Sequence, residues 1–328
     1  MRHVGAAELR AAIGFEELIE PVAQAFVKTA RGEAANRAFT FHPLIDPSRA
    51  DVMVKGGAVA GESLFVVKVA PWYADLAATG AAQGGLFMIF DAATGRPVMA
   101  IEDEHHISDI RTAAAGALAA RYLAPARVSV AGVVGAGRQA ELQALALHRE
   151  RAFATLLIWA RRTPAAEALA DRLGRQLPKV AIHVLTDLEA LARQAEVLVT
   201  TTPATTPLIQ ADWIGAGRHV TAIGADDAGK CELDPACLAR ATIVAVDERA
   251  TALAGGEVHH ARAAGHDLGD RMVELGAIIH GSVRGRRSAD DITIATFSGI
   301  GAQDVLAASA IVAALDRRAI GRRSRAPQ

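Results

Sequence analysis

The residues best suited to bind a ligand form a glycine-rich turn between a β-branched run and an Ala- and Leu-rich stretch. Residues 128–134 predict a buried strand, and residues 139–149 predict a helix. Between them, Gly135, Gly137 and Ala140 complete the pattern Gly-x-Gly-x-x-Ala. The first Gly makes a tight turn, and the second lets backbone N–H groups and the helix dipole meet a pyrophosphate. The flanking strand and helix favour a dinucleotide site over an ordinary turn. The predicted cofactor contacts are Gly135, Ala136, Gly137, Arg138 and Gln139.

The choice of dinucleotide is expected just after the second strand of this unit, predicted at 155–160. A carboxylate there would bond the ribose 2′-OH of NAD(H), but the chain has Arg161 and Arg162. Two arginines favour the 2′-phosphate of NADP(H), although they could instead stack on the adenine. We therefore expect NADP(H) in preference to NAD(H).

Charged residues elsewhere are suited to act on a substrate. Lys68 lies within the apolar run 65–69, where it is either a buried ammonium group or a surface lysine at a sheet edge. Arg111 precedes an apolar helix, and its guanidinium fork either binds a carboxylate or pairs with a nearby acid, Asp109 or Glu104.

A carboxyl group follows another predicted strand, at 218–223. Asp226 lies at the carboxyl end of that strand, where it is either a turn residue or a general acid/base. The second role requires burial or neighbouring groups to bring its pKa near the working pH. Asp227 is the adjacent, lesser candidate.

The elements that position these residues indicate two domains of an α/β protein. After residue 128, strands and helices alternate, which predicts a parallel, doubly wound sheet that binds ligands at its carboxyl edge. Before it, a helix at 8–31, short strands between 39 and 101 and a hairpin after Asp91 predict an α+β domain. Ser108 or Asp109 is expected to cap the connecting helix. The predicted strands are 128–134, 155–160, 180–185, 196–201, 218–223, 242–247 and 292–297, and the helices between them are 139–149, 164–174 and 187–194.

We assign residues 125–301 to a Rossmann dinucleotide-binding domain. Residues 1–124 form the other domain, and the Ala-rich helix expected at about 302–328 is long enough to cross back and pack on it.

Composition excludes several classes of protein. The chain has 328 residues, 51% hydrophobic, with a formal net charge of −1, which gives no reason to expect nucleic acid or a membrane surface as partner. There is no leader-like start or membrane-length apolar run. Cys231 and Cys237 form no disulfide framework, which suits the cytoplasm. The pairs His105-His106 and His259-His260 lack metal-ligand spacing, so no metal is expected.

Four segments occur together in the order of a known family: 65–68, 110–115, the glycine-rich turn, and 222–233. The chain resembles the ornithine cyclodeaminase / μ-crystallin family, and residues 213–238 and 255–260 are most similar to its ectoine-utilisation branch. The resemblance implies a homodimer with a nicotinamide-binding Rossmann domain. It also implies that residues 1–124, completed by the C-terminal helix at about 302–328, form the substrate-binding and dimerisation domain. Members include ornithine cyclodeaminases, alanine dehydrogenases and imino-acid reductases, in which a hydride moves between C4 of the nicotinamide and the α-carbon of an amino or imino acid.

The resemblance also implies roles for individual residues. Lys68 would hold the substrate carboxylate and polarise the imine, and Arg111 would bind the same carboxylate. Arg37 is a weaker match to a second carboxylate-binding arginine. Asp226 would transfer the proton of the substrate nitrogen; μ-crystallins lack this aspartate. The remaining cofactor contacts by resemblance are Thr112, Thr201, Thr202, Ser298 and Gly299.

Lys55 is a departure from the family pattern. It stands where ornithine cyclodeaminases have an acidic residue that faces the distal ammonium of the substrate. If it lines the pocket, it repels that ammonium and attracts a distal carboxylate; otherwise it is an exposed lysine beside Gly56-Gly57.

These features predict an NAD(P)H-dependent reductase of an α-imino acid, a ketimine resembling iminosuccinate, that forms the L-amino acid and runs in reverse as a dehydrogenase. The alternatives are an NAD-dependent ornithine cyclodeaminase-type ammonia-lyase and a non-catalytic μ-crystallin-like NADP-binding protein.

Overall fold

The computed structural model describes residues 1–46 and 49–323. The chain forms two compact units, one made of Met1–Arg111 with Ile300–Gln328 and the other of Thr112–Gly299. We call them the N-terminal unit and the central unit. Helix α4 (His106–Leu123) runs through the boundary at Arg111.

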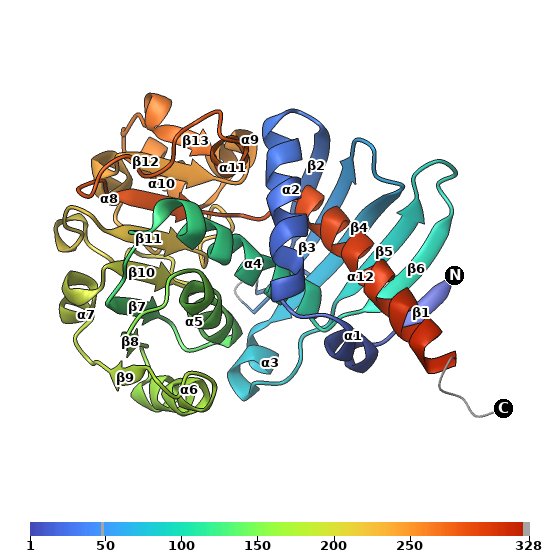
Figure 1. Ribbon diagram of the computed structural model, residues 1–328, viewed down its shortest axis with the longest axis horizontal. Helices are drawn as coiled ribbons and strands as arrows, with labels where there is room; N and C mark the ends of the chain where they lie inside the picture. Colours follow the sequence, from blue (N-terminus) through green and yellow to red (C-terminus); the bar gives the residue numbers. More distant parts are fainter. Residues whose placement is uncertain (47–48, 324–328) are drawn as a thin grey trace. The chain divides into compact units, whose positions relative to one another are not determined.

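The N-terminal unit is built on a six-stranded mixed sheet with the order β1-β6-β5-β4-β3-β2. Its elements are β1 (Arg2–Val4), α1 (Ala6–Ala12), α2 (Ile19–Ala30), β2 (Ala34–Phe41), β3 (Ala50–Val59), β4 (Leu64–Tyr73), α3 (Ala74–Thr79), β5 (Leu86–Asp91), β6 (Pro97–Glu102) and α12 (Gly301–Arg323). Strand β1 is parallel to β6, and β2 to β6 form antiparallel neighbours, including the predicted hairpin after Asp91. Helix α12 packs on β2, β3 and β4 and against α2, so that it returns the end of the chain to this sheet (Figure 1).

Two local predictions in this unit were wrong. The helix expected at 8–31 is divided, because Ile13 takes an extended conformation and Glu17 accepts the N–H of Gly14 at 3.0 Å. Helix α4 begins earlier than expected, and the carboxylate that accepts the N–H of Ile107 belongs to Asp103, at 3.1 Å. Ser108 and Asp109 therefore lie inside the helix and do not cap it.

The central unit contains an eight-stranded sheet in which every neighbouring pair is parallel, with the order β13-β12-β14-β11-β10-β7-β8-β9. Its strands are β7 (Val130–Val134), β8 (Thr155–Trp159), β9 (Ala181–Val184), β10 (Val197–Thr200), β11 (His219–Ala222), β12 (Ile243–Val246), β13 (Met272–Glu274) and β14 (Thr293–Thr296). Because β7 lies between β8 and β10, the strand order reverses at β7, which is where such sheets bind dinucleotides. The predicted fold class, a doubly wound Rossmann domain together with an α+β domain, is confirmed.

Helices follow most strands of the central unit. They are α5 (Arg138–Glu150), α6 (Thr163–Gln176), α7 (Leu188–Gln194), α8 (Pro235–Arg240), α9 (Arg249–Ala254), α10 (Gly256–Ala263) and α11 (Leu275–His280). The residues of β10, β11, β12 and β14 are all buried, which explains their continuous β-branched and small-residue sequences.

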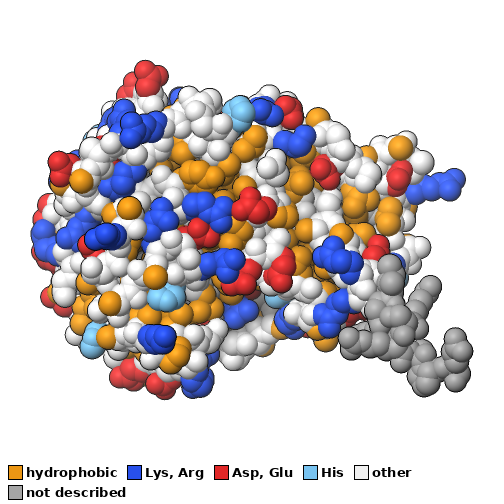
Figure 2. All heavy atoms as spheres, viewed as in Figure 1, with side chains coloured by type: hydrophobic (Ala, Val, Ile, Leu, Met, Phe, Trp, Pro, Cys, Tyr) orange, Lys and Arg blue, Asp and Glu red, His pale blue; other side chains and the backbone are white. Residues whose placement is uncertain are grey.

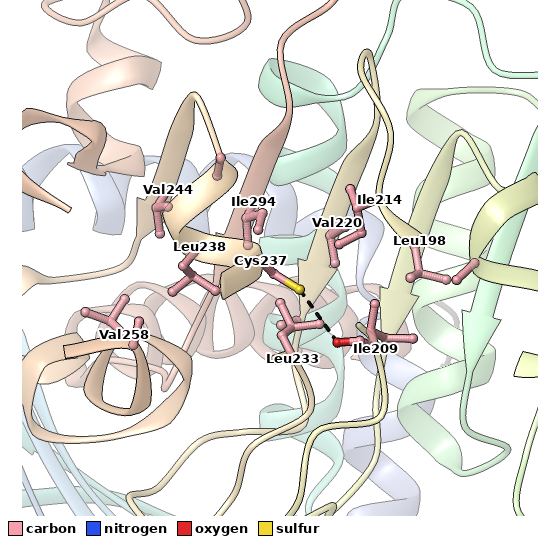
Figure 3. Packing of buried hydrophobic residues seen from close by; sticks show 14 of the residues in the cluster. Leu198, Ile209, Ile214, Val220, Leu233, Cys237, Leu238, Val244, Val258 and Ile294 are labelled. Carbon is pink, nitrogen blue, oxygen red and sulfur yellow. Dashed lines mark hydrogen bonds between the residues drawn. The ribbon is translucent and has the colours of Figure 1, made fainter. Parts of the chain in front are cut away.

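A hydrophobic cluster joins these strands to the helices and loops beside them (Figure 3). Leu198, Val220 and Ile294 contribute from the strands, and Leu238 and Val258 from α8 and α10. On the face of the molecule that Figure 2 shows, Lys and Arg side chains are interspersed with Asp and Glu. Within the ranges 1–46 and 49–323, no helix combines the length and apolarity that a membrane span requires.

Candidate active site

A cluster of buried charged side chains lies between the sheet and α12 in the N-terminal unit. Lys68 on β4 is 2% exposed, so it is not a surface lysine. Its ammonium group donates to Ser108 Oγ at 3.1 Å and to Asp304 Oδ1 at 3.3 Å, and lies 5.5 Å from the ring centroid of Phe87. Asp304 is on α12, 236 residues away in sequence, so the helix that completes this unit supplies the counter-ion.

Lys55 belongs to the same buried face of the sheet. It is directly opposite Lys68 in the antiparallel register of β3 and β4 and is 3% exposed. Cross-strand partners project from the same face of a sheet, so the two lysines are neighbours. The alternative of an exposed lysine beside Gly56 is therefore excluded.

Arg111 approaches the cluster from α4. Its Nη1 donates to Gln303 Oε1 at 3.3 Å, and its Nε lies 3.7 Å from Asp304 Oδ1. Glu104, one of the acids considered as its partner, instead pairs with Arg10 at 2.6 Å. Three polar atoms of this cluster are buried and make no hydrogen bond within the described part of the chain: Arg111 Nε, Gln303 Nε2 and Asp304 Oδ2. Two of them are N–H donors, and leaving a donor unsatisfied costs about 1–3 kcal/mol, so the cluster is suited to an oxygen-bearing anion.

The pKa shifts of the charged groups in this cluster also favour a bound anion. Burial lowers the pKa of Lys68; the nearby Asp304 opposes this shift and Arg111 adds to it. Burial raises the pKa of Asp103 to about 6, although Lys68 opposes the shift. A bound carboxylate would restore a favourable environment for the lysine and arginine charges.

Arg37 is not brought to this cluster. It is exposed on β2 and its Nη1 donates to the carbonyl of Asn36 at 2.6 Å. Its register partner is Gly56, whereas Ala38 is the partner of Lys55. Arg37 therefore lies on the face of the sheet opposite Lys55 and Lys68.

The glycine-rich turn of the central unit has the backbone geometry that a pyrophosphate requires. Gly135 has φ +126°, and a Cβ there would lie 2.3 Å from Thr201 Oγ1, so no side chain fits. Gly137 is the N-cap of α5, has no side-chain cap, and has no heavy atom within 4 Å of the position a Cβ would take. An open helix N-terminus of this kind fits the phosphates of a dinucleotide. Ala136, Arg138 and Gln139 lie in the same turn and the first turn of α5.

Three other predicted cofactor contacts lie on elements next to this turn: one on α4, which is bonded to α5, and two after β8. Gln143 of α5 donates to the carbonyl of Thr112 at 2.9 Å, which joins the central part of α4 to α5. Arg161 and Arg162 are exposed and follow β8, the direct neighbour of β7.

The remaining predicted residues follow three adjacent strands. Thr201 and Thr202 follow β10, Asp226 lies beyond β11, and Ser298-Gly299 follows β14. Because β14, β11, β10 and β7 are consecutive and parallel, these segments all emerge at the edge that carries the glycine-rich turn. The central unit thus gathers the predicted cofactor contacts and Asp226 at one edge.

Asp226 is half-buried and ion-paired. Lys230 Nζ lies 2.6 Å from Asp226 Oδ1 and 3.1 Å from Asp227 Oδ2. Burial lowers the pKa of Lys230, but the two carboxylates outweigh it and raise that pKa overall. Asp226 therefore has a cationic partner four residues further along the chain.

No role was predicted for Gln303 or Asp304, and Ser108 was predicted only as a possible N-cap of the connecting helix. A usable signal was present, because Gln303-Asp304 are polar residues in an Ala-rich apolar helix that directly follows Ser298-Gly299. Across residues 1–46 and 49–323, no group of three or more His, Cys, Asp or Glu is arranged to hold a metal ion.

The parallel sheet with a glycine-rich turn at its switch point defines a nucleotide-binding Rossmann domain. Residues 4–317 match the sequence profile of the ornithine cyclodeaminase/mu-crystallin family. The chain belongs to this family, as its motifs predict.

Similar proteins are oxidoreductases or cyclodeaminases by name. A Sinorhizobium fredii protein named as an uncharacterized cyclodeaminase is 38% identical over 279 residues, 84% of either chain. The iminosuccinate reductase of Paracoccus denitrificans is 37% identical over 225 residues, 68% of either chain. Its crystal structure in complex with NAD⁺ has a TM-score of 0.87 and 30% identity, with 98% of either chain covered. An archaeal alanine dehydrogenase dimer with bound NAD has a TM-score of 0.87 and 28% identity, with 97% of either chain covered. The family is therefore one of enzymes that includes NAD-linked oxidoreductases.

Proposed function

We propose that this protein is an NAD(P)H-dependent reductase that converts an α-imino acid to the L-amino acid and acts in reverse as an amino-acid dehydrogenase. The observation that carries the proposal is the buried cluster of Lys68, Arg111 and Gln303, in which Arg111 Nε and Gln303 Nε2 make no hydrogen bond within the described residues. A carboxylate supplies the two oxygens that these donors lack. Imino acids present a carboxylate next to the C=N bond that is reduced.

The residues of the chain divide the work of this reaction. The guanidinium group of Arg111 and the ammonium group of Lys68 bind the α-carboxylate, and Ser108 and Asp304 hold Lys68 in place. Asp226 donates a proton to the imine nitrogen and takes it back in the reverse direction. The glycine-rich turn at Gly135–Gly137 would hold the nicotinamide cofactor, which would supply the hydride for the α-carbon. One proton and one hydride thus convert C=N to CH–NH.

Lys55 indicates an acidic side chain on the substrate. A second buried ammonium group opposite Lys68 offers a site for a distal carboxylate and repels a distal ammonium. We therefore propose a dicarboxylic imino acid of the iminosuccinate type, for which the Paracoccus denitrificans relative is named. Arg37 has no part in this proposal, because it lies on the other face of the sheet.

Arg161 and Arg162 support a preference for NADP(H) over NAD(H). They occupy the segment after β8, where a carboxylate would otherwise bond the ribose 2′-OH. The solved relatives described above contain NAD or NAD⁺, so both cofactors belong in the test.

A homodimer is supported by the outer face of the N-terminal sheet. Phe39 is 61% exposed and Phe41 is 47% exposed, and their neighbours on that face include the apolar Val54, Val67 and Met88. The exposed Arg37 lies on the same face, so an apolar patch with a charged residue beside it is available to pack against a second copy. The archaeal alanine dehydrogenase named above is a dimer.

A substrate panel tests the proposal. Purified protein is mixed with NADH or NADPH, ammonia and a keto acid that is dicarboxylic, neutral or basic, and absorbance of the reduced nicotinamide is followed. Fastest consumption with the dicarboxylic acid and NADPH supports the proposal in full. Consumption with none of them overturns it.

A further inference from the structure

A buried carboxylate lies beneath the ligand-binding edge of the central sheet, and the reaction proposed above gives it no role. Glu232 has no exposed surface. Its Oε1 accepts the backbone N–H and the hydroxyl of Thr202 at 2.5 and 2.8 Å. Its Oε2 accepts the hydroxyl of Thr200 at 2.8 Å and the N–H of Gly224 at 2.7 Å. One carboxylate therefore joins the ends of two adjacent strands, β10 and β11.

The packing around this carboxylate leaves no room for a side chain at Gly224. A Cβ on Gly224 would lie 2.1 Å from the carbonyl oxygen of Thr202 and 2.7 Å from Cδ of Glu232. The residue at this position must therefore be glycine. Thr202 is one of the proposed cofactor contacts, and Asp226 lies two residues beyond Gly224.

A second buried carboxylate holds Glu232 itself. Glu257 is 1% exposed, and its Oε1 accepts the N–H of Glu232 at 2.8 Å while its Oε2 accepts the N–H of Leu233 at 3.2 Å. The carbonyl of Glu232 accepts the N–H groups of Leu208 and Ile209. The backbone that carries Glu232 is thus fixed from both sides.

We infer that Glu232 is a positioning residue for the proposed reaction, which holds the cofactor loop at Thr201–Thr202 and the proton-transfer loop at Gly224–Asp226 in one fixed arrangement. The inference rests on the proposed function. Four donors point at the two oxygens of Glu232, which uses the full acceptor capacity of an ionised carboxylate. Burial raises the pKa of Glu232, and the bonds from Thr202, Thr200 and Gly224 oppose that shift.

The decisive variant is Glu232→Gln. It keeps the size of the side chain but replaces one acceptor oxygen with an NH₂ donor that faces existing donors. The matched control is Glu196→Gln. Glu196 also accepts two backbone N–H groups, from Ser129 at 2.5 Å and Val130 at 2.9 Å, but it does so at the amino ends of the strands, away from the ligand edge.

Three quantities are measured well below the unfolding temperature: the dissociation constant of the reduced cofactor from its fluorescence, kcat with KM, and the pH profile of kcat. We expect Glu232→Gln to weaken cofactor binding by about tenfold and to lower kcat by about 10–100-fold, the range for misplaced reacting groups. The pKa values of its pH profile should not move, because Glu232 touches no reacting atom. Glu196→Gln should change neither binding nor kcat by more than about twofold.

Wild-type kcat and cofactor binding in Glu232→Gln would overturn the inference, and so would an equal loss in Glu196→Gln. Loss of one limb of the pH profile would show that Glu232 itself transfers a proton, which also overturns a positioning role. If Glu232→Gln does not fold, Thr200→Val removes one of the four donors, and unchanged binding and kcat in that variant overturn the inference. If the wild-type protein binds cofactor but reduces no imino acid, the proposed function fails, and the cofactor dissociation constants still test whether Glu232 holds the Thr201–Thr202 loop.

Discussion

Lys55 and Lys68 face each other directly across strands β3 and β4, and both side chains are buried. Like charges directly opposite each other destabilise a sheet. The ion pair between Lys68 and Asp304 offsets part of this repulsion. A ligand with two carboxylates, as in the proposed substrate, would offset more of this repulsion.

The first prediction concerns Lys55→Glu. A carboxylate at this position should repel a distal carboxylate and accept a distal ammonium, so kcat/KM should fall for dicarboxylic imino acids and rise for basic ones. We expect the ratio of the two kcat/KM values to change by about 100-fold, since reversing a charge costs several kcal/mol. The exposed Lys179→Glu, which alters net charge equally, should leave the ratio unchanged. An unaltered ratio in Lys55→Glu would remove Lys55 from the pocket.

The second prediction separates two adjacent carboxylates. Asp226→Asn cannot exchange a proton, so turnover should fall by at least about 100-fold, the contribution of a general acid/base. The dissociation constant of the cofactor should stay nearly the same. Asp227→Asn also loses an ion pair with Lys230 and serves as the control, with turnover within about threefold of wild type. Surviving turnover in Asp226→Asn would show that another group transfers the proton.

The third prediction concerns the cofactor. Replacing Arg161 and Arg162 by alanine removes the charges that we propose to bind a 2′-phosphate, so KM for NADPH should rise by about 10–100-fold, in line with the loss of charge-assisted hydrogen bonds. KM for NADH should change by less than about threefold. Steady-state kinetics with both cofactors measure the difference. Equal changes in the two KM values would mean that the arginines only stack on the adenine.

The fourth prediction concerns stability against pH. Burial raises the pKa of Glu257 from 4.5 to about 7. The folded protein therefore binds more protons than the unfolded chain between these values, so the free energy of unfolding contributed by Glu257 falls as pH rises from 4.5 to 7. Full loss is on the order of 3 kcal/mol, at about 1.4 kcal/mol for each pH unit.

Glu257→Gln removes this contribution. Urea unfolding at pH 5 and pH 7.5 should show that the wild type loses more stability on going to the higher pH than the variant does. The exposed Glu167→Gln is the control and should follow the wild type. Parallel pH dependence of wild type and Glu257→Gln would contradict the assigned shift.

The sequence was sufficient for the central sheet and for the family. Strands β7, β8, β9, β10, β11, β12 and β14 lie within the predicted ranges. Most of them are buried parallel strands, which favour β-branched and apolar residues, whereas β9 lies at the edge of the sheet and is not buried. Strand β13 has only three residues, and helices α8, α9, α10 and α11 have six to eight, so their patterns are too short to be recognised.

The hydrogen-bond partners and the burial of the charged residues around Lys68 could not be predicted from the sequence. The bonds from Lys68 to Ser108 and Asp304 join residues 40 and 236 positions apart, which no local pattern reveals. The burial of Lys55 depends on its register with Lys68, while the adjacent glycines suggested an exposed turn equally well. Arg37 was predicted from the resemblance as a weaker match, and the alternation of β2 places it on the other face.

The most direct test of the central claim is stopped-flow absorbance at the reduced-nicotinamide band with iminosuccinate formed from oxaloacetate and ammonia, combined with product analysis. We predict net consumption of NADPH or NADH in equal amount to the aspartate formed. Ammonia release from ornithine without net change in the nicotinamide would instead identify a cyclodeaminase, and cofactor binding without any turnover would identify a binding protein. Either result would contradict the reductase.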